Sequence, residues 1–135
     1  VTEEDRRDFK TGFRAPDIVE AVQKTADGQI SEAALKAADT AECEKMLTKI
    51  KGVGSKVANC CMLFGLDKRD AFPVDVWIKR IMEQLYFSGK ETDKEKIAAF
   101  AKTRFGSYGG YAQQYLFFYG ETVRIGTQNQ KIKKV

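Results

Sequence analysis

The sequence predicts an all-α fold, an orthogonal bundle of about seven short helices. Apolar residues recur three and four positions apart along the chain, and no alternating run is long enough to argue for a strand. Cap signatures precede several of these apolar stripes. With 135 residues, 43% of them hydrophobic, the chain can bury one core. We expect one helical domain over residues 1–125 and a frayed basic tail over residues 126–135.

The first three helices follow from their start signals. Pro16 suits a first helical position, and the apolar stripe behind it ends near Gly28. Ser31 is expected to cap a short helix through Ala38. Residues 39–42, Asp-Thr-Ala-Glu, read as a capping box ahead of a helix whose apolar residues share one face. The remaining helices are predicted over residues 55–65, from Asp75 to about Leu85, over residues 92–105 behind a second capping box at residues 92–95, and over residues 111–123.

Composition limits the classes of function. The net charge of +4 is only mildly basic, so by itself it is weak evidence for a nucleic-acid partner. No apolar run approaches the roughly 18 residues of a membrane span. Three cysteines, two of them adjacent, and no histidine argue against zinc or iron–sulfur sites and indicate reduced thiols in an intracellular protein. Basic residues gather around one turn and the loop after it: Lys45, Lys49, Lys51, Lys56, Lys68, Arg69, Lys79 and Arg80.

That turn is Gly52-Val53-Gly54, between two apolar helices. Its glycines permit close approach of another molecule, and the N–H groups that open the next helix favour an anion. We therefore predict a hairpin that binds the DNA backbone; the alternative is an ordinary helix–helix turn. The backbone carbonyls of Thr48, Ile50 and Val53 could converge on a monovalent cation, K⁺ or Na⁺, that bridges to a DNA phosphate.

Lys56 stands in the first turn of the helix after the hairpin. A cation there opposes the helix dipole, at a cost of about 0.3–1 kcal/mol when exposed. The same field disfavours the charged amine, and a lysine nucleophile has to be neutral. Partial burial would act in the same direction. The position is thus unfavourable for stability and suited to an attacking amine, although a lysine that contacts phosphate is the alternative.

Asp75 follows Pro73 and Val74, which hold the chain extended and present the carboxylate at a helix N-terminus. Negative charge is stabilised there by the helix dipole. A carboxylate in this place can stabilise an oxocarbenium-like sugar or move protons for the lysine. The simpler role of a plain N-cap is compatible with either.

Together these residues resemble a known family. The hairpin, Lys56 and Pro73-Val74-Asp75 are similar to the helix-hairpin-helix (HhH-GPD) DNA glycosylases. The Lys-Val-Ala-x-Cys continuation from Lys56 to Cys60 and the run from Gly106 to Gln113 resemble the 8-oxoguanine glycosylase branch in particular. The resemblance implies a bifunctional glycosylase/AP lyase of base-excision repair that removes 8-oxoguanine from duplex DNA through a lysine Schiff base. Neither a redox cofactor nor a catalytic metal would be required.

The resemblance also assigns residues. Lys56 and Asp75 would be catalytic; Cys60 and Phe117 would sandwich the flipped base, and Gln113 would hydrogen-bond its Watson–Crick edge. Enzymes of this kind extrude the base because its atoms are inaccessible within the stack. The implied DNA contacts lie elsewhere: Gly52, Val53, Gly54 and Lys51 on the backbone, Trp77 in place of a histidine that reaches a phosphate, and Phe13 and Arg14 as a wedge on the opposite strand.

Two alternatives stay open at this point. One is a helix-hairpin-helix glycosylase of different lesion specificity, and the other is a non-enzymatic DNA-binding module in which Lys56 contacts phosphate. Members of the family carry an upstream region that completes damage recognition. We therefore expect the chain to be the C-terminal part of a larger, monomeric, DNA-associated enzyme, weakly active or inactive by itself.

Overall fold

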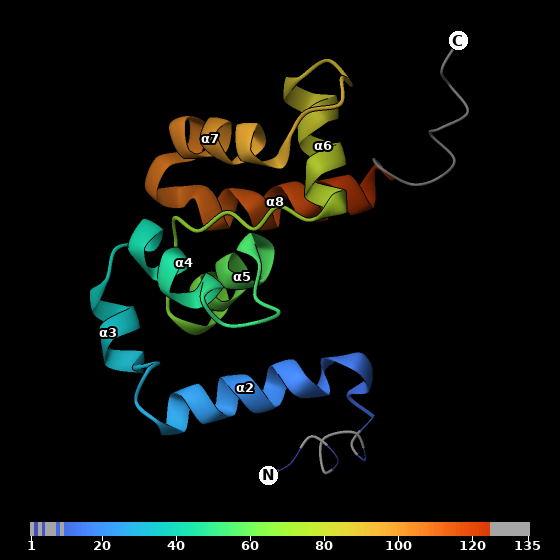
Figure 1. The fold of residues 1–135 in the computed structure, drawn as a ribbon. Helices are drawn as coiled ribbons and strands as arrows, with labels where there is room; N and C mark the ends of the chain where they lie inside the picture. The colour runs from blue at the N-terminus through green and yellow to red at the C-terminus, as the bar shows by residue number, and fades with distance from the viewer. Residues whose placement is uncertain (1, 3, 5–7, 9, 125–135) are drawn as a thin grey trace.

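A computed structural model describes residues 2, 4, 8 and 10–124. Figure 1 shows an arrangement of short helices, and no strand occurs within the described residues, which confirms the predicted all-α class. None of the described helices is long and apolar enough to cross a membrane. The predicted tail over residues 126–135 lies outside the described residues. The elements are η1 (Gly12–Arg14), α2 (Ala15–Ala26), α3 (Glu32–Ala37), α4 (Thr40–Thr48), α5 (Ser55–Gly65), α6 (Val76–Tyr86), α7 (Lys94–Phe105), η2 (Gly106–Tyr108) and α8 (Gly109–Thr122).

Most of the predicted caps are in place. The Ser31 side chain accepts the N–H of Ala34, and the Asp39 side chain accepts the N–H of Glu42. Each satisfies a donor that the first helical turn leaves without a backbone partner. The start signals therefore set where α3 and α4 begin.

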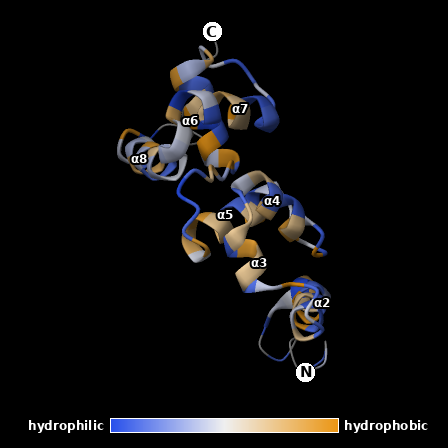
Figure 2. Cartoon of the chain, turned by 90° about the vertical axis from the view of Figure 1, so that its left-hand side faces the viewer, coloured by the Kyte–Doolittle hydropathy of each residue, from blue (hydrophilic) through white to orange (hydrophobic). Residues whose placement is uncertain are grey.

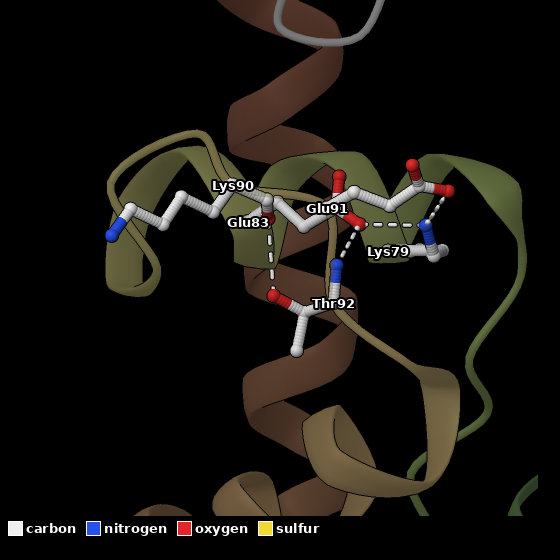
Figure 3. A network of polar contacts seen from close by, with 5 residues as sticks. All are labelled: Lys79, Glu83, Lys90, Glu91 and Thr92. Carbon is white, nitrogen blue, oxygen red and sulfur yellow. Dashed lines mark hydrogen bonds and ion pairs between the residues drawn. The ribbon is translucent and has the colours of Figure 1, made fainter.

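The second predicted capping box is wrong. α7 begins at Lys94 with Asp93 as its N-cap, and Asp93 makes no side-chain cap hydrogen bond. Thr92, the expected cap, is buried: its N–H donates to the Glu83 carboxylate at 3.1 Å, and its hydroxyl donates to the carbonyl of Lys90 at 3.0 Å (Figure 3). Glu83 of α6 therefore hydrogen-bonds the residue that was expected to cap α7. Sequence spacing alone does not reveal this contact.

Two clusters of buried residues form the core. The first lies in α3, α4 and α5, and the second in α6, α7 and α8; Figure 2 shows these two groups one above the other, with α2 beyond the first. The clusters meet at consecutive residues, because Ala71 belongs to the first and Phe72 to the second. The first contains Leu35, Cys43, Leu47, Ile50, Ala58, Met62 and Ala71, and the second contains Phe72, Val74, Ile78, Ile81, Met82, Ile97 and Ala101.

Two glycines at the start of α8 allow this helix to pack closely against the junction. The N–H of Gly110 donates to the carbonyl of Arg69 at 2.7 Å. A Cβ at Gly110 would lie 2.7 Å from the carbonyl oxygen of Arg69, and one at Gly109 would lie 2.8 Å from the carbonyl oxygen of Asp70. Such distances are sterically forbidden, so only glycine allows this approach. The start of α8 is therefore placed beside the segment that leads to Asp75.

Candidate active site

The hairpin joins α4 to α5. Gly52 has φ +82°, in the left-handed region that favours glycine, and the N–H of Val53 donates to the carbonyl of Ile50 at 3.1 Å. Gly54 is the N-cap of α5 and brings no capping side chain. The first N–H groups of α5 are therefore left for water or for an anion, as the sequence predicts.

Lys56 is the second residue of α5 and is exposed. The partial burial considered for this lysine is therefore absent in the structure. Its neighbours hold the turn: the Ser55 hydroxyl donates to the Glu44 carboxylate, and the Asn59 amide donates to the carbonyl of Ser55 at 2.9 Å. The backbone that carries Lys56 is therefore fixed to α4 while the amine stays accessible.

Cys60 lies one turn after Lys56 and is half-buried. Burial raises the pKa of its thiol above the ordinary value, the charge of Lys56 lowers it, and the charges of Cys61 and Asp75 raise it. Electrostatic effects of this kind fall off with distance. Cys60 therefore lies on the same face of α5 as Lys56, and the charge of Asp75, which caps another helix, also acts on its thiol.

Asp75 is the N-cap of α6, as predicted. One carboxylate oxygen, Oδ1, accepts the N–H of Ile78 at 2.8 Å, and the side chain is half-buried. That hydrogen bond is the only one the described residues give the carboxylate. Oδ2 is thus left to act on a bound molecule while the cap fixes the orientation.

Gln113 is buried, with 6% of its surface exposed, whereas Gln114 is exposed. Its amide donates to the carbonyl of Pro73 at 3.4 Å and accepts from the Gln114 amide at 2.6 Å. This places Gln113 against residues 71–75, the segment that ends in Asp75; that Gln113 and not Gln114 reads a base stays a prediction. Phe117 lies one turn further along α8 and is 39% exposed. Its pairing with Cys60 around a base stays a prediction.

The implied DNA contacts at the periphery are accessible. Phe13 is 84% exposed in η1, and the Arg14 guanidinium lies 5.7 Å from the centre of the Phe13 ring. Trp77 is exposed at the start of α6, with the Arg80 guanidinium 5.6 Å from its ring centre. The positive charge of Arg80 therefore lies beside the indole of Trp77. Lys51 is also exposed.

A groove of about 1360 Å³ runs between the start of α5 and α7. Ser55, Lys56 and Asn59 line it, together with Lys94 and Lys102 from α7. Its lining does not include Cys60, Gln113 or Phe117. The groove therefore reaches Lys56, whereas the residues predicted to hold the base lie outside its lining.

Comparisons with known proteins agree with this geometry. No family model matches the chain. A probable N-glycosylase/DNA lyase of Methanothermobacter thermautotrophicus is 36% identical over 113 residues, covering 84% of this chain and 36% of that protein. The N-glycosylase/DNA lyase OGG1 of Arabidopsis thaliana is 34% identical over 127 residues, covering 87% of this chain and 35% of that protein.

A solved structure decides the family. The Clostridium acetobutylicum 8-oxoguanine glycosylase/lyase, in complex with duplex DNA containing cytosine opposite 8-oxoguanine, matches with a TM-score of 0.86 and 39% identity. The chain belongs to the helix-hairpin-helix DNA glycosylases. The match covers 93% of this chain and 43% of that structure, so the chain spans less than half the length of this solved relative and little more than a third of the two curated ones.

Sequence reasoning missed one set of contacts at the hairpin. Lys24 of α2 donates to the carbonyl of Lys49 at 3.1 Å. Glu20 pairs with Lys24 at 2.6 Å, and Asp17 lies against Gly52. The i,i+4 spacing of Glu20 and Lys24 was visible as an intrahelical ion pair, but nothing in the sequence showed that this face of α2 meets the hairpin.

Proposed function

We propose that the protein is a bifunctional DNA glycosylase/AP lyase that removes 8-oxoguanine from duplex DNA. The observation that carries the proposal is the placement of the exposed Lys56 at the start of α5 behind the hairpin, with Gln113 hydrogen-bonded to the segment that ends in the N-cap Asp75. Membership in a family whose relatives are named N-glycosylase/DNA lyase supports it. The proposed partner is duplex DNA, held at the hairpin by backbone N–H groups and nearby lysines.

The chemistry proceeds through Lys56. Its neutral amine attacks C1′ of the flipped nucleotide, the glycosidic bond breaks, and the base leaves with the bonding electron pair and takes up a proton. The sugar ring opens to an imine between Lys56 and C1′. Loss of a proton from C2′ then expels the 3′ phosphate by β-elimination. Asp75 stabilises the positive charge that develops on the sugar.

The roles of the pocket residues are part of the same proposal. Cys60 and Phe117 would contact the two faces of the base, and Gln113 would read its edge. Phe13 and Arg14 would enter the space that the flipped base vacates, and Trp77 with Lys51 would contact phosphates. The remaining recognition groups would come from the part of the enzyme that its relatives carry outside the matched region.

A monovalent cation at the hairpin is a further part of the proposal. The carbonyl of Ile50 already accepts one N–H, which leaves its second lone pair and the carbonyls of Thr48 and Val53 as ligands. K⁺ or Na⁺ held there would meet a DNA phosphate. Duplex affinity measured in Li⁺, Na⁺ and K⁺ at equal ionic strength tests this, because identical affinities in all three would exclude a specific cation site.

Borohydride trapping on a panel of duplexes tests the reaction and the substrate together. The intact protein should form a covalent adduct with a duplex containing 8-oxoguanine opposite cytosine and little with an undamaged duplex. Preference for another lesion on the same panel would replace the substrate while retaining the lysine chemistry. Tight duplex binding without any adduct would leave the non-enzymatic DNA-binding module as the function.

A further inference from the structure

Polar residues on one face of α2 lie against the backbone of the hairpin segment, residues 49–52. Asp17, Glu20 and Lys24 are three and four positions apart, so they share one face of the helix. Figure 1 shows α2 below α4 and α5, the two helices that the hairpin joins. We call Asp17, Glu20 and Lys24 the α2 polar face.

Each member of this face meets a different residue of the hairpin segment. The Lys24 ammonium donates to the carbonyl of Lys49 at 3.1 Å. The pKa of the Glu20 carboxyl is below its ordinary value, first because Lys24 hydrogen-bonds it at 2.6 Å and further because the backbone and the charge of Lys51 lie near it. A Cβ on Gly52 would lie 2.5 Å from Asp17 Oδ2, so the Asp17 carboxylate lies directly against the turn.

We propose that Asp17, Glu20 and Lys24 are positioning residues that hold the hairpin backbone in the conformation that binds DNA phosphates. Because α2 begins immediately after Phe13 and Arg14, the same contacts fix the distance from the opposite-strand wedge to the hairpin. The link to DNA rests on the function proposed above; the link between α2 and the hairpin does not.

A purely electrostatic role and a positioning role of the α2 polar face predict opposite changes in duplex affinity. Two carboxylates beside a phosphate-binding turn repel the phosphate, so electrostatics alone predicts tighter duplex binding when Glu20 is removed. Positioning predicts weaker binding, because the hairpin backbone loses a partner. The sign of the change therefore separates the two explanations.

The experiment compares Glu20→Ala with a matched control. Glu32→Ala removes the same charge from an i,i+4 pair with lysine of the same length, 2.6 Å, on α3. Glu20→Gln retains an acceptor oxygen for the Lys24 ammonium, which contacts the carbonyl of Lys49, without the charge. For each variant, hydrogen exchange of the Lys51 and Gly52 amides and affinity for an undamaged duplex are measured, with far-UV circular dichroism as the check on folding.

Glu20→Ala should speed exchange at Lys51 and Gly52 and weaken duplex affinity by about two- to ten-fold each, because Lys24 is no longer held beside the carbonyl of Lys49 and its hydrogen bond to the hairpin is lost. Glu20→Gln and Glu32→Ala should match the parent protein or bind slightly more tightly. Equal exchange in Glu20→Ala and Glu32→Ala would overturn the proposal, as would faster exchange without any loss of affinity. If the parent protein does not bind duplex DNA, the proposed function fails, and the exchange data still decide whether α2 holds the hairpin.

Discussion

At the scale of single residues, two charges that lie nineteen positions apart in the sequence affect the pKa of the Cys60 thiol: Lys56 lowers it and Asp75 raises it. The i,i+4 spacing of Lys56 and Cys60 predicted the first neighbour. The extended Pro73-Val74 segment predicted how Asp75 is presented, although not what it faces. Only the packing of α5 against that segment supplies the second neighbour.

The thiols test this arrangement without any DNA. Burial raises the pKa of Cys60, so at pH 8 it should be alkylated more slowly than the exposed Cys61, and the buried Cys43 only on unfolding. Lys56→Gln removes a charge that lowers the Cys60 pKa, and should slow its alkylation further. Asp75→Asn removes a charge that raises it, and should speed the reaction. Mass spectrometry of the labelled peptides follows each thiol, with Cys61 as internal reference; changes of the same sign in both variants would contradict the geometry.

Gly52 is constrained twice, by φ +82° and by the Asp17 carboxylate. Gly52→Ala should lower the free energy of unfolding by at least about 1–2 kcal/mol, the cost of a left-handed conformation for a residue with a Cβ. Gly65→Ala is the control, because Gly65 is helical with open space around it, and alanine there should be neutral or stabilising. Urea unfolding of both variants measures the difference. Equal effects would mean that the hairpin backbone is not held in this conformation.

At the scale of elements, the connection between α6 and α7 depends on one carboxylate. Glu83 binds the Lys79 ammonium at 2.7 Å and accepts the N–H of the buried Thr92 (Figure 3). Its side chain is 13% exposed, whereas Glu91, which lies 3.7 Å from the same ammonium, is 93% exposed. The second capping box failed here because Glu83, twelve residues before Glu95, hydrogen-bonds the backbone of Thr92 instead.

Glu83→Ala should destabilise the protein by about 1–3 kcal/mol, because it leaves the Thr92 N–H buried without a partner. Glu91→Ala, which removes the same charge near the same lysine, should cost less than about 1 kcal/mol, since the pair is exposed. Thermal unfolding compares them. The hydrogen bond with Glu83 raises the pKa of Lys79 above its ordinary value. The stabilisation of the folded state by this pair is therefore complete at neutral pH, and it is lost only as the pH rises through the raised pKa. Equal destabilisation by both variants would remove the special role of Glu83.

Helix-forming patterns predicted the elements because their signals are local. Ser31 and Asp39 cap the helices expected of them, and Asp75 begins α6. What the sequence could not supply was contact between elements. The α2 polar face, the Glu44 carboxylate on Ser55, and the exposed state of Lys56 all depend on packing between segments far apart in the chain.

At the scale of the whole molecule, the phosphate contacts should appear in the salt dependence of duplex binding. If Lys51 contacts one phosphate, Lys51→Ala should reduce the slope of log affinity against log salt by about 0.9. Lys90→Ala is the control: it changes the net charge equally, but Lys90 lies on the connection between α6 and α7, and its ammonium points away from the other residues drawn in Figure 3. Its slope should remain that of the parent protein. Equal reductions would show that net charge, and not a hairpin contact, governs binding.

The two core clusters explain why the site lies where it does. Lys56 and Cys60 belong to the helix that packs on the first cluster, Asp75 begins the helix that packs on the second, and the clusters join at Ala71 and Phe72. The helices that carry the predicted residues therefore pack on the two sides of this joint. The motifs and their resemblance to the family indicated the residues, and the packing of the two clusters sets how their helices lie.

The identity of the trapped residue tests the central claim most directly. The intact protein is incubated with a duplex containing 8-oxoguanine opposite cytosine in the presence of borohydride, digested, and the modified peptide is sequenced by mass spectrometry. The predicted result is one adduct, a secondary amine between the deoxyribose remnant and the Nζ atom of Lys56, which disappears in Lys56→Gln although duplex binding remains. An adduct on Lys51 or another lysine, or an undiminished yield from Lys56→Gln, would contradict it.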